Sequence, residues 1–371
     1  MSDFVLAATR SVRSYASRVT DHLVKFPSFS SMAESINGVH ILNTDRFANG
    51  EMEVSISRSV RGQDVILMAS CARNEAGLSM EEAKLELYHA VDALKRAQAR
   101  RIIVFEPFIS CSRSDRTTRR NSVGLWVHFK ILVSLGVGHI ITYQLHSNKS
   151  NSMLDPCICS IDDIPGLTLM ERYLCDSLIR NIDTLEKVVR PKWAFCSVDV
   201  GGEKLARGFA NAFGAPLVVA HKQRDYSRSN TVESVNLLSA EPVEGKVLWI
   251  VDDMIDTAAS VESLIRALAP LRPMEINIIA VHAPFSHPAA KRLSLLMEEK
   301  LLNRIMVTDT VCSSFINAGS DEKLPPMEVV PSAELSARII HTLVMNASMG
   351  ELMMSFNAEK YLKSPDLFFG N

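Results

Sequence analysis

The chain alternates short apolar runs with stretches of helical periodicity over most of its length. Most of the runs are apolar throughout, which is typical of strands that are buried on both faces of a parallel sheet. In the clearest helical stretch, apolar residues recur on one face, at Ala83, Leu87, Val91 and Leu94. The succession of strands and helices predicts an α/β protein whose sheets are mainly parallel and flanked by helices.

The predicted strands are Phe4–Ala7, Val65–Ala69, Arg101–Phe105, His139–Tyr143, Ala194–Val198, Pro216–Ala220, Val247–Val251 and Ile276–Val281. The predicted helices are Met80–Gln98, Leu125–Leu135, Leu169–Asn181, Glu203–Phe213, Thr257–Leu268 and Ser332–Met345.

These elements fall into two series, separated by the proline- and aspartate-rich stretch Asp155–Gly166, which is typical of a crossing between domains. We therefore predict an N-terminal domain over residues 1–164, a C-terminal domain over 165–346 and an extension over 347–371. The extension carries Leu352, Met353, Met354 and Phe356. It either docks on a surface of this chain or of a neighbouring subunit, or it frays.

Composition narrows the class of protein. The 371 residues include 40 basic and 42 acidic side chains, a net charge of −2, which argues against a general nucleic-acid binder. No apolar run is long enough to cross a membrane. Seven cysteines lie scattered in mostly apolar settings, as expected for free thiols in the cytoplasm. Cys157 and Cys159 are the only close pair, so a structural zinc site is not expected.

The end of the apolar run Val247–Val251 is the most informative stretch. Asp252 and Asp253 follow it directly, and Asp256 precedes a small-residue loop that opens a helical pattern. Backbone N–H groups at a helix N-terminus bind anions, and carboxylates at a strand end suit sugar hydroxyls or Mg²⁺. The combination predicts a sugar-phosphate site, and an ordinary turn with an acidic cap is the alternative.

Two basic stretches suit phosphate groups. Arg113, Arg116, Arg119 and Arg120 follow a predicted strand, and guanidinium groups grip phosphate oxygens with two hydrogen bonds. His221–Arg224 ends another strand, and we expect its cations on a mobile loop that closes over a transferring phosphoryl group. For both stretches a solvated basic loop is the alternative.

Further candidates lie at the ends of other elements. His146 and Asp199 each follow a strand, and together they offer an imidazole and a carboxylate to Mg²⁺. Gly201 and Gly202 come after Asp199 and allow a ligand to approach the backbone closely. Phe47–Glu51 combines an aromatic ring, an amide and a carboxylate, which suits a purine, but a plain turn into a strand is favoured here.

Taken in order, these stretches resemble the ribose-phosphate diphosphokinase family, also called phosphoribosyl pyrophosphate synthetases. The resemblance covers about residues 4–345. Its strongest part is Val251–Thr257, which matches the family's phosphoribosyl-binding signature. The supporting matches are Arg46–Glu51, Arg113–Arg116, His139–His146, Asp199–Gly202, Lys222–Arg224, Val281–Ser286 and Val307–Thr310.

The resemblance implies two phosphoribosyltransferase-like domains with active sites at their junction, often shared between subunits. It implies transfer of the β,γ-diphosphoryl group of ATP to O1 of ribose 5-phosphate, with Mg²⁺ as cofactor. Dimers that build hexamers, with inorganic phosphate and ADP as possible effectors, are also implied.

Matched position by position, the resemblance assigns roles in four groups. The catalytic cations are Lys222 and Arg224, and the metal-linked positions are His146 and Asp199. The ATP side comprises Phe47, Asn49, Gly50, Glu51, Arg113, Ser114, Asp115 and His146. The ribose 5-phosphate loop comprises Asp252, Asp253, Asp256, Thr257, Ala258, Ala259 and Ser260.

Four of these or neighbouring positions depart from the family's pattern. Ala259 replaces a glycine, Ser114 a glutamine, and Asn49 and Gln144 each an aspartate. If position 259 needs a positive φ, alanine there costs on the order of 1 kcal/mol. The departures leave two alternatives open. One is a weak paralogue that binds nucleotide and regulates a true synthetase, and the other is a plain phosphoribosyltransferase.

Overall fold

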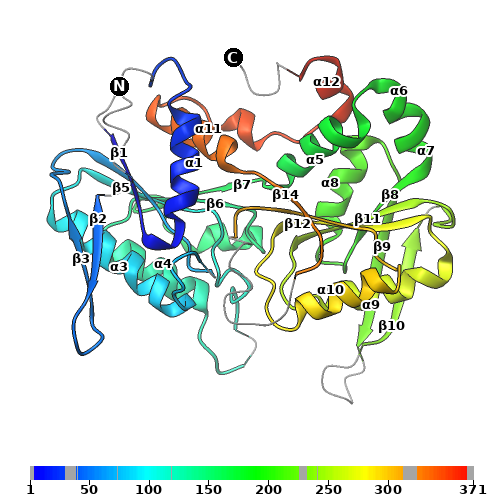
Figure 1. The fold of residues 1–371 in the computed structure, drawn as a ribbon, viewed down its shortest axis with the longest axis horizontal. Helices are drawn as coiled ribbons and strands as arrows, with labels where there is room; N and C mark the ends of the chain where they lie inside the picture. Colours follow the sequence, from blue (N-terminus) through cyan, green and yellow to red (C-terminus); the bar gives the residue numbers. More distant parts are fainter. Residues whose placement is uncertain are drawn as a thin grey trace. The chain divides into compact units, whose positions relative to one another are not determined.

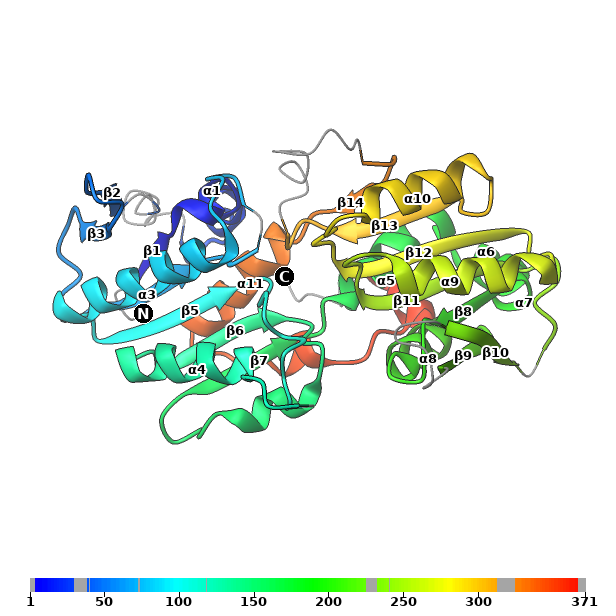
Figure 2. The ribbon, with the colours of Figure 1, turned by 90° about the horizontal axis from the view of Figure 1, so that it is seen from below.

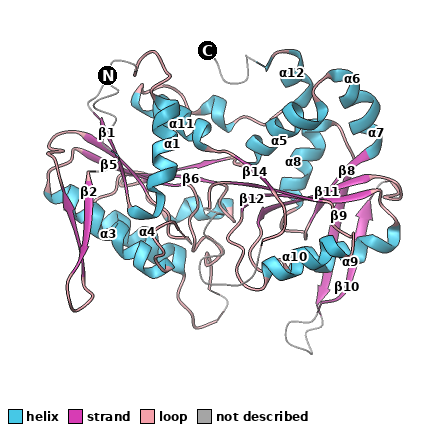
Figure 3. Ribbon diagram, viewed as in Figure 1, coloured by secondary structure: helices cyan, strands magenta, loops and turns pink. Residues whose placement is uncertain are grey.

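The computed structural model describes residues 4–29, 39, 41–72, 74–117, 119–224, 232–239, 241–311 and 324–365. Contacts divide the chain into two compact units. The first comprises Met1–Pro165, Thr310–Ala318 and Pro331–Met353, and the second comprises Gly166–Asp309, Gly319–Val330 and Met354–Asn371. Each unit is an open sheet with helices on both faces (Figure 1, Figure 3).

The sheet of the first unit is parallel throughout, in the order β1-β4-β5-β6-β7. Its strands are β1 (Phe4–Ala8), β4 (Asp64–Met68), β5 (Arg101–Glu106), β6 (His139–Tyr143) and β7 (Ser160–Ile164). The first four are almost wholly buried, which explains their apolar runs. The carboxyl ends of all five strands therefore meet at one edge of the sheet.

Helices α3 (Met80–Arg96) and α4 (Gly124–Leu135) cover one face of this sheet, and α1 (Arg13–Leu23) and α11 (Ala333–Val344) lie on the other (Figure 1, Figure 2). Helix α3 begins with a capping box in which Ser79 and Glu82 satisfy each other's backbone N–H groups. Helix α4 ends at Gly136, whose φ of 99° suits glycine. An antiparallel hairpin, β2 (Leu42–Arg46) and β3 (Met52–Ile56), forms a separate small sheet that packs on α3.

The helix α11 belongs to the first unit, whereas the linear division drawn from the sequence assigned its residues to the C-terminal domain. Three buried hydroxyl contacts of 2.7 Å attach it there. The Tyr15 hydroxyl meets Ser332 and Ser336, and the Tyr143 hydroxyl meets Ser336. Contacts between residues so far apart in the chain leave no periodic signal, which is why the sequence did not reveal them.

The sheet of the second unit has the order β10-β9-β8-β11-β12-β13-β14 and is parallel except where β10 runs antiparallel to β9. Its strands are β8 (Trp193–Ser197), β9 (Leu217–Arg224), β10 (Val232–Ser239), β11 (Val247–Met254), β12 (Glu275–His282), β13 (Arg304–Thr308) and β14 (Glu328–Val330). The central strands β8, β11 and β12 are largely buried.

Helices α5 (Leu167–Leu174) and α8 (Glu203–Phe213) cover one face of the second sheet, and α9 (Ala259–Leu268) and α10 (Ala289–Glu298) cover the other (Figure 1, Figure 2). A π-helical turn, Cys175–Ile179, continues α5, and two short helices, α6 (Ile182–Thr184) and α7 (Arg190–Lys192), lead into β8.

The C-terminal segment docks on the second unit through α12 (Ala358–Lys363). Phe356 is 6% exposed, with its ring 6.4 Å from that of Phe213. The Tyr361 hydroxyl donates to Asp176 at 2.8 Å, and Arg190 pairs with Glu359 at 2.9 Å. Of the two expectations for the extension, docking is therefore correct for the described part.

The predicted fold class is confirmed, and every predicted strand and helix is present, most with shifted ends and two, His139–Tyr143 and Glu203–Phe213, with the predicted ends. The main omission is β7, because Asp162 and Asp163 gave its sequence the character of a linker. The strands β2, β10, β13 and β14 and the helices α6, α7, α10 and α12 were also not predicted. No described helix combines the length and the apolar character that crossing a membrane requires.

Candidate functional site

Asp252 and Asp253 are part of strand β11, near its carboxyl end, rather than beyond it. They therefore lie at the carboxyl edge of the second sheet. Asp199 reaches the same edge, because β8 is the parallel neighbour of β11 and Ser197 is in register with Val251. Asp253 is 6% exposed, and its backbone N–H donates to Asp252 Oδ1 at 3.0 Å. The structure thus brings together three of the carboxylates that the sequence singled out.

The pKa of Asp252 is raised well above its usual range, first by burial and then by the negative charge of Asp253, with Asp199 adding to it. Two carboxylates this close repel each other unless a proton, a hydroxyl donor or a cation lies between them. The pair is therefore suited to the vicinal hydroxyls of a sugar.

The loop after β11 turns sharply into helix α9. Ala258 adopts the left-handed conformation with φ 58° and ψ 8°, and α9 begins at Ala259. The exposed residues Ala259 and Ser260 thus form the first turn of α9, where backbone N–H groups have no partner within the helix. Arg292 of α10 supports the loop by donating to the Thr257 carbonyl at 2.9 Å.

This geometry corrects the expectation for Ala259. It is Ala258 that has a positive φ, while Ala259 is a helical residue. The substitution of glycine by alanine at position 259 therefore creates no backbone strain. The strain lies one residue earlier, where an L-residue is disfavoured by about 1–2 kcal/mol.

Ala258→Gly is therefore expected to stabilise the protein by about 1 kcal/mol, because glycine adopts the left-handed conformation without penalty. Ala259→Gly is the matched control and should destabilise by roughly 0.5–1 kcal/mol, because glycine weakens a helix. Denaturant unfolding of the two variants measures both effects. A lower stability of Ala258→Gly than of the unsubstituted protein would contradict this assignment of the strain.

The glycines after Asp199 have a structural reason of their own. Asp199 is exposed, and its Oδ1 accepts the backbone N–H of Gly202 at 3.0 Å, just before helix α8. A Cβ added at Gly201 would lie 3.1 Å from that oxygen. Neither glycine has a positive φ, so Gly201 makes room for the carboxylate rather than for an unusual backbone conformation.

Lys222 and Arg224 lie two residues apart near the carboxyl end of one strand. Both belong to strand β9, in register with Val235 and Val232 of β10. The expectation that they lie on a loop is therefore wrong for their backbone, which is extended and paired. Their side chains and residues 225–231 lie outside the described part of the chain.

The arginine cluster of the first unit follows strand β5. Arg113 is exposed and Asp115 is partly buried, as expected for groups that meet a ligand. Ser114 accepts two backbone N–H groups, that of Gly124 through its hydroxyl at 2.8 Å and that of Leu125 through its carbonyl at 3.1 Å. It ties the loop to the first turn of α4.

His146 is exposed just beyond strand β6. The strand ends at Tyr143, and Gln144 directly after it is a non-glycine residue with φ 42°. The Leu145 backbone N–H donates to Asp163 Oδ1 of β7 at 2.9 Å, and burial raises the pKa of Asp163 to about 6. Asp163 thus supports the segment that presents His146, a role that its place in a supposed linker concealed.

Phe47–Glu51 forms the tip of the β2–β3 hairpin. The Phe47 N–H donates to the Glu51 carbonyl at 2.9 Å, Gly50 has φ 88°, and the Phe47 side chain is 53% exposed. Asn49 Oδ1 accepts the Glu51 N–H at 3.1 Å. The segment is thus a turn, as favoured above, and it also presents an aromatic ring to solvent.

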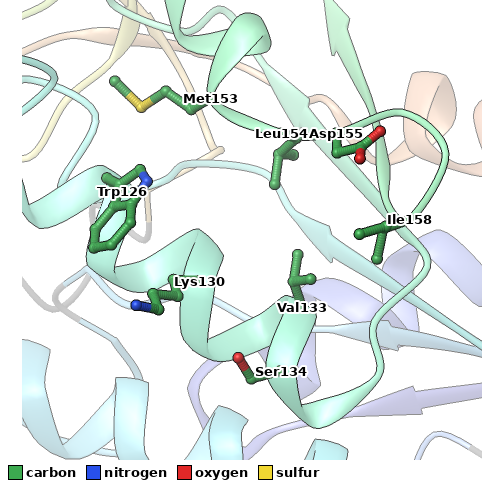
Figure 4. A pocket seen from close by; sticks show the side chains of 8 residues that line it. All are labelled: Trp126, Lys130, Val133, Ser134, Met153, Leu154, Asp155 and Ile158. Carbon is green, nitrogen blue, oxygen red and sulfur yellow. The ribbon is translucent and has the colours of Figure 1, made fainter.

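A groove beside α4 is lined by residues other than those discussed above (Figure 4). Its lining includes Trp126 and Ile158. The Lys130 Nζ lies over the Trp126 ring, 4.7 Å from the ring centre. None of its lining residues was predicted as a site residue.

Among the described residues, no group of three or more histidine, cysteine, aspartate or glutamate side chains is arranged to hold a metal ion.

Two family models match the chain. The N-terminal domain of ribose phosphate pyrophosphokinase matches residues 4–136, and the phosphoribosyl transferase domain matches residues 174–300. The first match favours a diphosphokinase over a plain phosphoribosyltransferase.

Curated relatives are similar over most of their length. A ribose-phosphate pyrophosphokinase of Fusobacterium nucleatum is 30% identical over 308 residues, which cover 83% of this chain and 88% of the relative. One from Prochlorococcus marinus is 32% identical over 311 residues, covering 83% and 84%.

The crystal structure of phosphoribosylpyrophosphate synthetase from Mycobacterium smegmatis has the same fold, with a TM-score of 0.74, 24% identity, and coverage of 93% of this chain and 100% of that one. The two family models match residues in both units and include every predicted site residue except His146. The chain belongs to the ribose-phosphate pyrophosphokinase family.

Proposed function

We propose that this protein transfers the β,γ-diphosphoryl group of ATP to O1 of ribose 5-phosphate. The observation that carries the proposal is the carboxyl edge of the second sheet, where Asp252 and Asp253 adjoin the N-terminal turn of α9. Carboxylates for sugar hydroxyls and backbone N–H groups for a phosphate are there supplied side by side.

In the proposed reaction the O1 oxygen of the sugar attacks the β-phosphorus of ATP, and the bond from that phosphorus to the oxygen of AMP breaks. Asp252 and Asp253 hold the ring hydroxyls, and the first turn of α9 holds the 5-phosphate. This fixes the direction in which O1 points. Lys222 and Arg224 neutralise charge on the transferring group as it develops.

The first unit holds ATP in this proposal. Arg113 binds phosphate oxygens, Asp115 and His146 complete the nucleotide side, and the ring of Phe47 stacks on adenine with Asn49 and Glu51 beside it. The exposure of Arg113, His146 and Phe47 supports these roles.

Mg²⁺ is the proposed cofactor. Since no cluster of three protein ligands exists among the described residues, the fit is to an ion that keeps most of its sites for water and phosphate oxygens. His146 and Asp199 would each offer one ligand. When bound, the ion would spread the negative charge of the transferring phosphates.

Three further assignments belong to the proposal. We assign the protein to the cytoplasm, which the free state of six cysteines in the described ranges supports. We assign it a homo-oligomeric state, a dimer that builds a hexamer. We also assign inorganic phosphate and ADP as effectors, on the family resemblance alone.

AMP formation by the purified protein tests the function directly. With ATP, Mg²⁺ and ribose 5-phosphate we expect AMP to appear, and omission of the sugar should abolish it. Repeating the assay with and without inorganic phosphate tests the effector. Binding of both substrates without AMP formation would show that the chain is not a diphosphokinase.

A further inference from the structure

A buried polar chain joins the last residue of β5 to both helices on that face of the first sheet. Glu106 is 0% exposed, and its Oε2 lies 2.7 Å from His128 Nε2 on α4. The other ring nitrogen of His128, a residue that is 2% exposed, lies 2.9 Å from the Tyr88 hydroxyl on α3. None of these residues was assigned a role above.

The direction of each hydrogen bond in the series Tyr88–His128–Glu106 follows from which group keeps its proton. Burial, reinforced by the Cys71 thiol and by Glu106, raises the pKa of Tyr88 well above its usual range, so its hydroxyl keeps its proton. Tyr88 then donates to His128 Nδ1, and His128 Nε2–H donates to the Glu106 carboxylate. This order of hydroxyl, imidazole and carboxylate fixes the orientation of the imidazole ring.

The pair is not what packing alone would select. The core of this sheet face is largely apolar, with the Phe129 ring beside that of His128, and the Cys71 thiol is the polar group that also interacts with Glu106. The second oxygen of Glu106 and the hydroxyl of Thr142, its register neighbour on β6, have no hydrogen-bond partner within the described residues. Two apolar side chains of similar volume would fill this space without burying a carboxylate.

The pair closes the base of the loop that carries Arg113 and Asp115. That loop begins directly after Glu106 and ends at α4, of which His128 is part. A second closure is the hydrogen bond from Gly124 to Ser114. Gly124 also permits a close approach there, since a Cβ added to it would lie 3.3 Å from the Ser114 side chain.

We propose that Glu106 and His128 are positioning residues that hold Arg113 and Asp115 in the geometry that binds the phosphates of ATP. The inference rests on the proposed function, in which this loop binds ATP. The Ser114–Gly124 contact fixes the middle of the loop to α4, and the Glu106–His128 contact fixes α4 to the sheet. Release of the second contact shifts both ligand-binding side chains.

The test compares Glu106→Leu, His128→Leu and the double variant. The KM for ATP should rise by roughly 10- to 100-fold in all three, the scale expected when binding groups are misplaced by about 1 Å. The KM for ribose 5-phosphate, which binds in the other unit, should stay within about twofold. The double variant should recover the melting temperature lost by the single ones, because no buried charge is left unpaired.

His139→Gln is the matched control. It removes another contact between histidine and a carboxylate of the first unit, from His139 Nε2 to Asp162 Oδ2 at 2.9 Å, at the opposite end of β6. Its KM for ATP should not change. A double variant that recovers both the melting temperature and the KM for ATP would overturn the inference, since the pair would then serve packing only.

The outcome for the proposed function is read separately, from AMP formation by the unsubstituted protein. If that protein binds MgATP but forms no AMP, the proposed reaction fails. Calorimetric titration of the variants with MgATP then decides the inference. Equal dissociation constants for the variants and the unsubstituted protein would sink it, and a 10-fold or larger loss would support it.

Discussion

Lys222→Ala is expected to lower kcat by roughly 10²- to 10³-fold, the effect of removing one group that stabilises charge in the transition state. The KM for ATP should change only a few-fold, because such a group interacts more strongly with the transition state than with bound substrate. Steady-state kinetics with ATP and ribose 5-phosphate each varied in turn measure the two effects.

The backbone of β9 sharpens this prediction. Lys222 and Arg224 lie two residues apart in a paired strand, so the backbone brings both to the same end of β9. Arg224→Ala should therefore resemble Lys222→Ala. Lys187→Ala is the control, because Lys187 is an exposed helix residue paired with Asp183, and it should leave kcat unchanged. Equal losses in kcat and in ATP affinity for Lys222→Ala would contradict a transition-state role.

Most strands of the two sheets were predictable because burial on two faces imposes an apolar run that survives without tertiary information. The run at β11 is buried as predicted, and its ending in Asp252 correctly located the carboxyl edge of the sheet. Strand β7 was not predicted because it lacks such an apolar run. It lies at the edge of its sheet, so Asp162 and Asp163 are tolerated there and the apolar signal is missing.

The candidate site was predictable where one local segment carries its chemistry. The loop Asp252–Ser260 places carboxylates and a helix N-terminus within a few residues of one another. The supporting contacts were not predictable. Glu106 meets His128, and Leu145 meets Asp163, across 22 and 18 positions of sequence respectively, so no spacing rule connects them. The positive φ was considered for position 259, but it occurs at Ala258. Which residue adopts it depends on where strand β11 ends and helix α9 begins, and the sequence does not fix these points to one residue.

Asp252→Asn is expected to separate stability from activity. Loss of the carboxylate should lower kcat/KM for ribose 5-phosphate by roughly 10- to 150-fold, equivalent to one hydrogen bond made by a charged group. The same change should stabilise the folded protein, because it removes a buried carboxyl whose charge is disfavoured by burial and by Asp253.

The pH dependence gives this gain a definite sign. The pKa of Asp252 is raised in the folded protein, so between its unfolded value near 4 and its folded value the folded state holds more protons. Stability therefore falls as pH rises through that interval, and the penalty is complete only above the folded pKa. The advantage of Asp252→Asn should be small near pH 4 and should grow toward neutral pH.

Asp64→Asn provides the control for this interpretation. Asp64 is also buried, at 5% exposure, but Arg100 and Arg101 contact its two oxygens at 2.8 and 3.0 Å. Removal of its charge should destabilise the protein at neutral pH, because the two guanidinium groups lose their partner. Denaturation midpoints of both variants between pH 5 and pH 8 measure the contrast. If Asp252→Asn loses stability as Asp64→Asn does, then Asp252 is held by a favourable partner, and the acidic edge of β11 is a structural feature rather than a sugar-binding one.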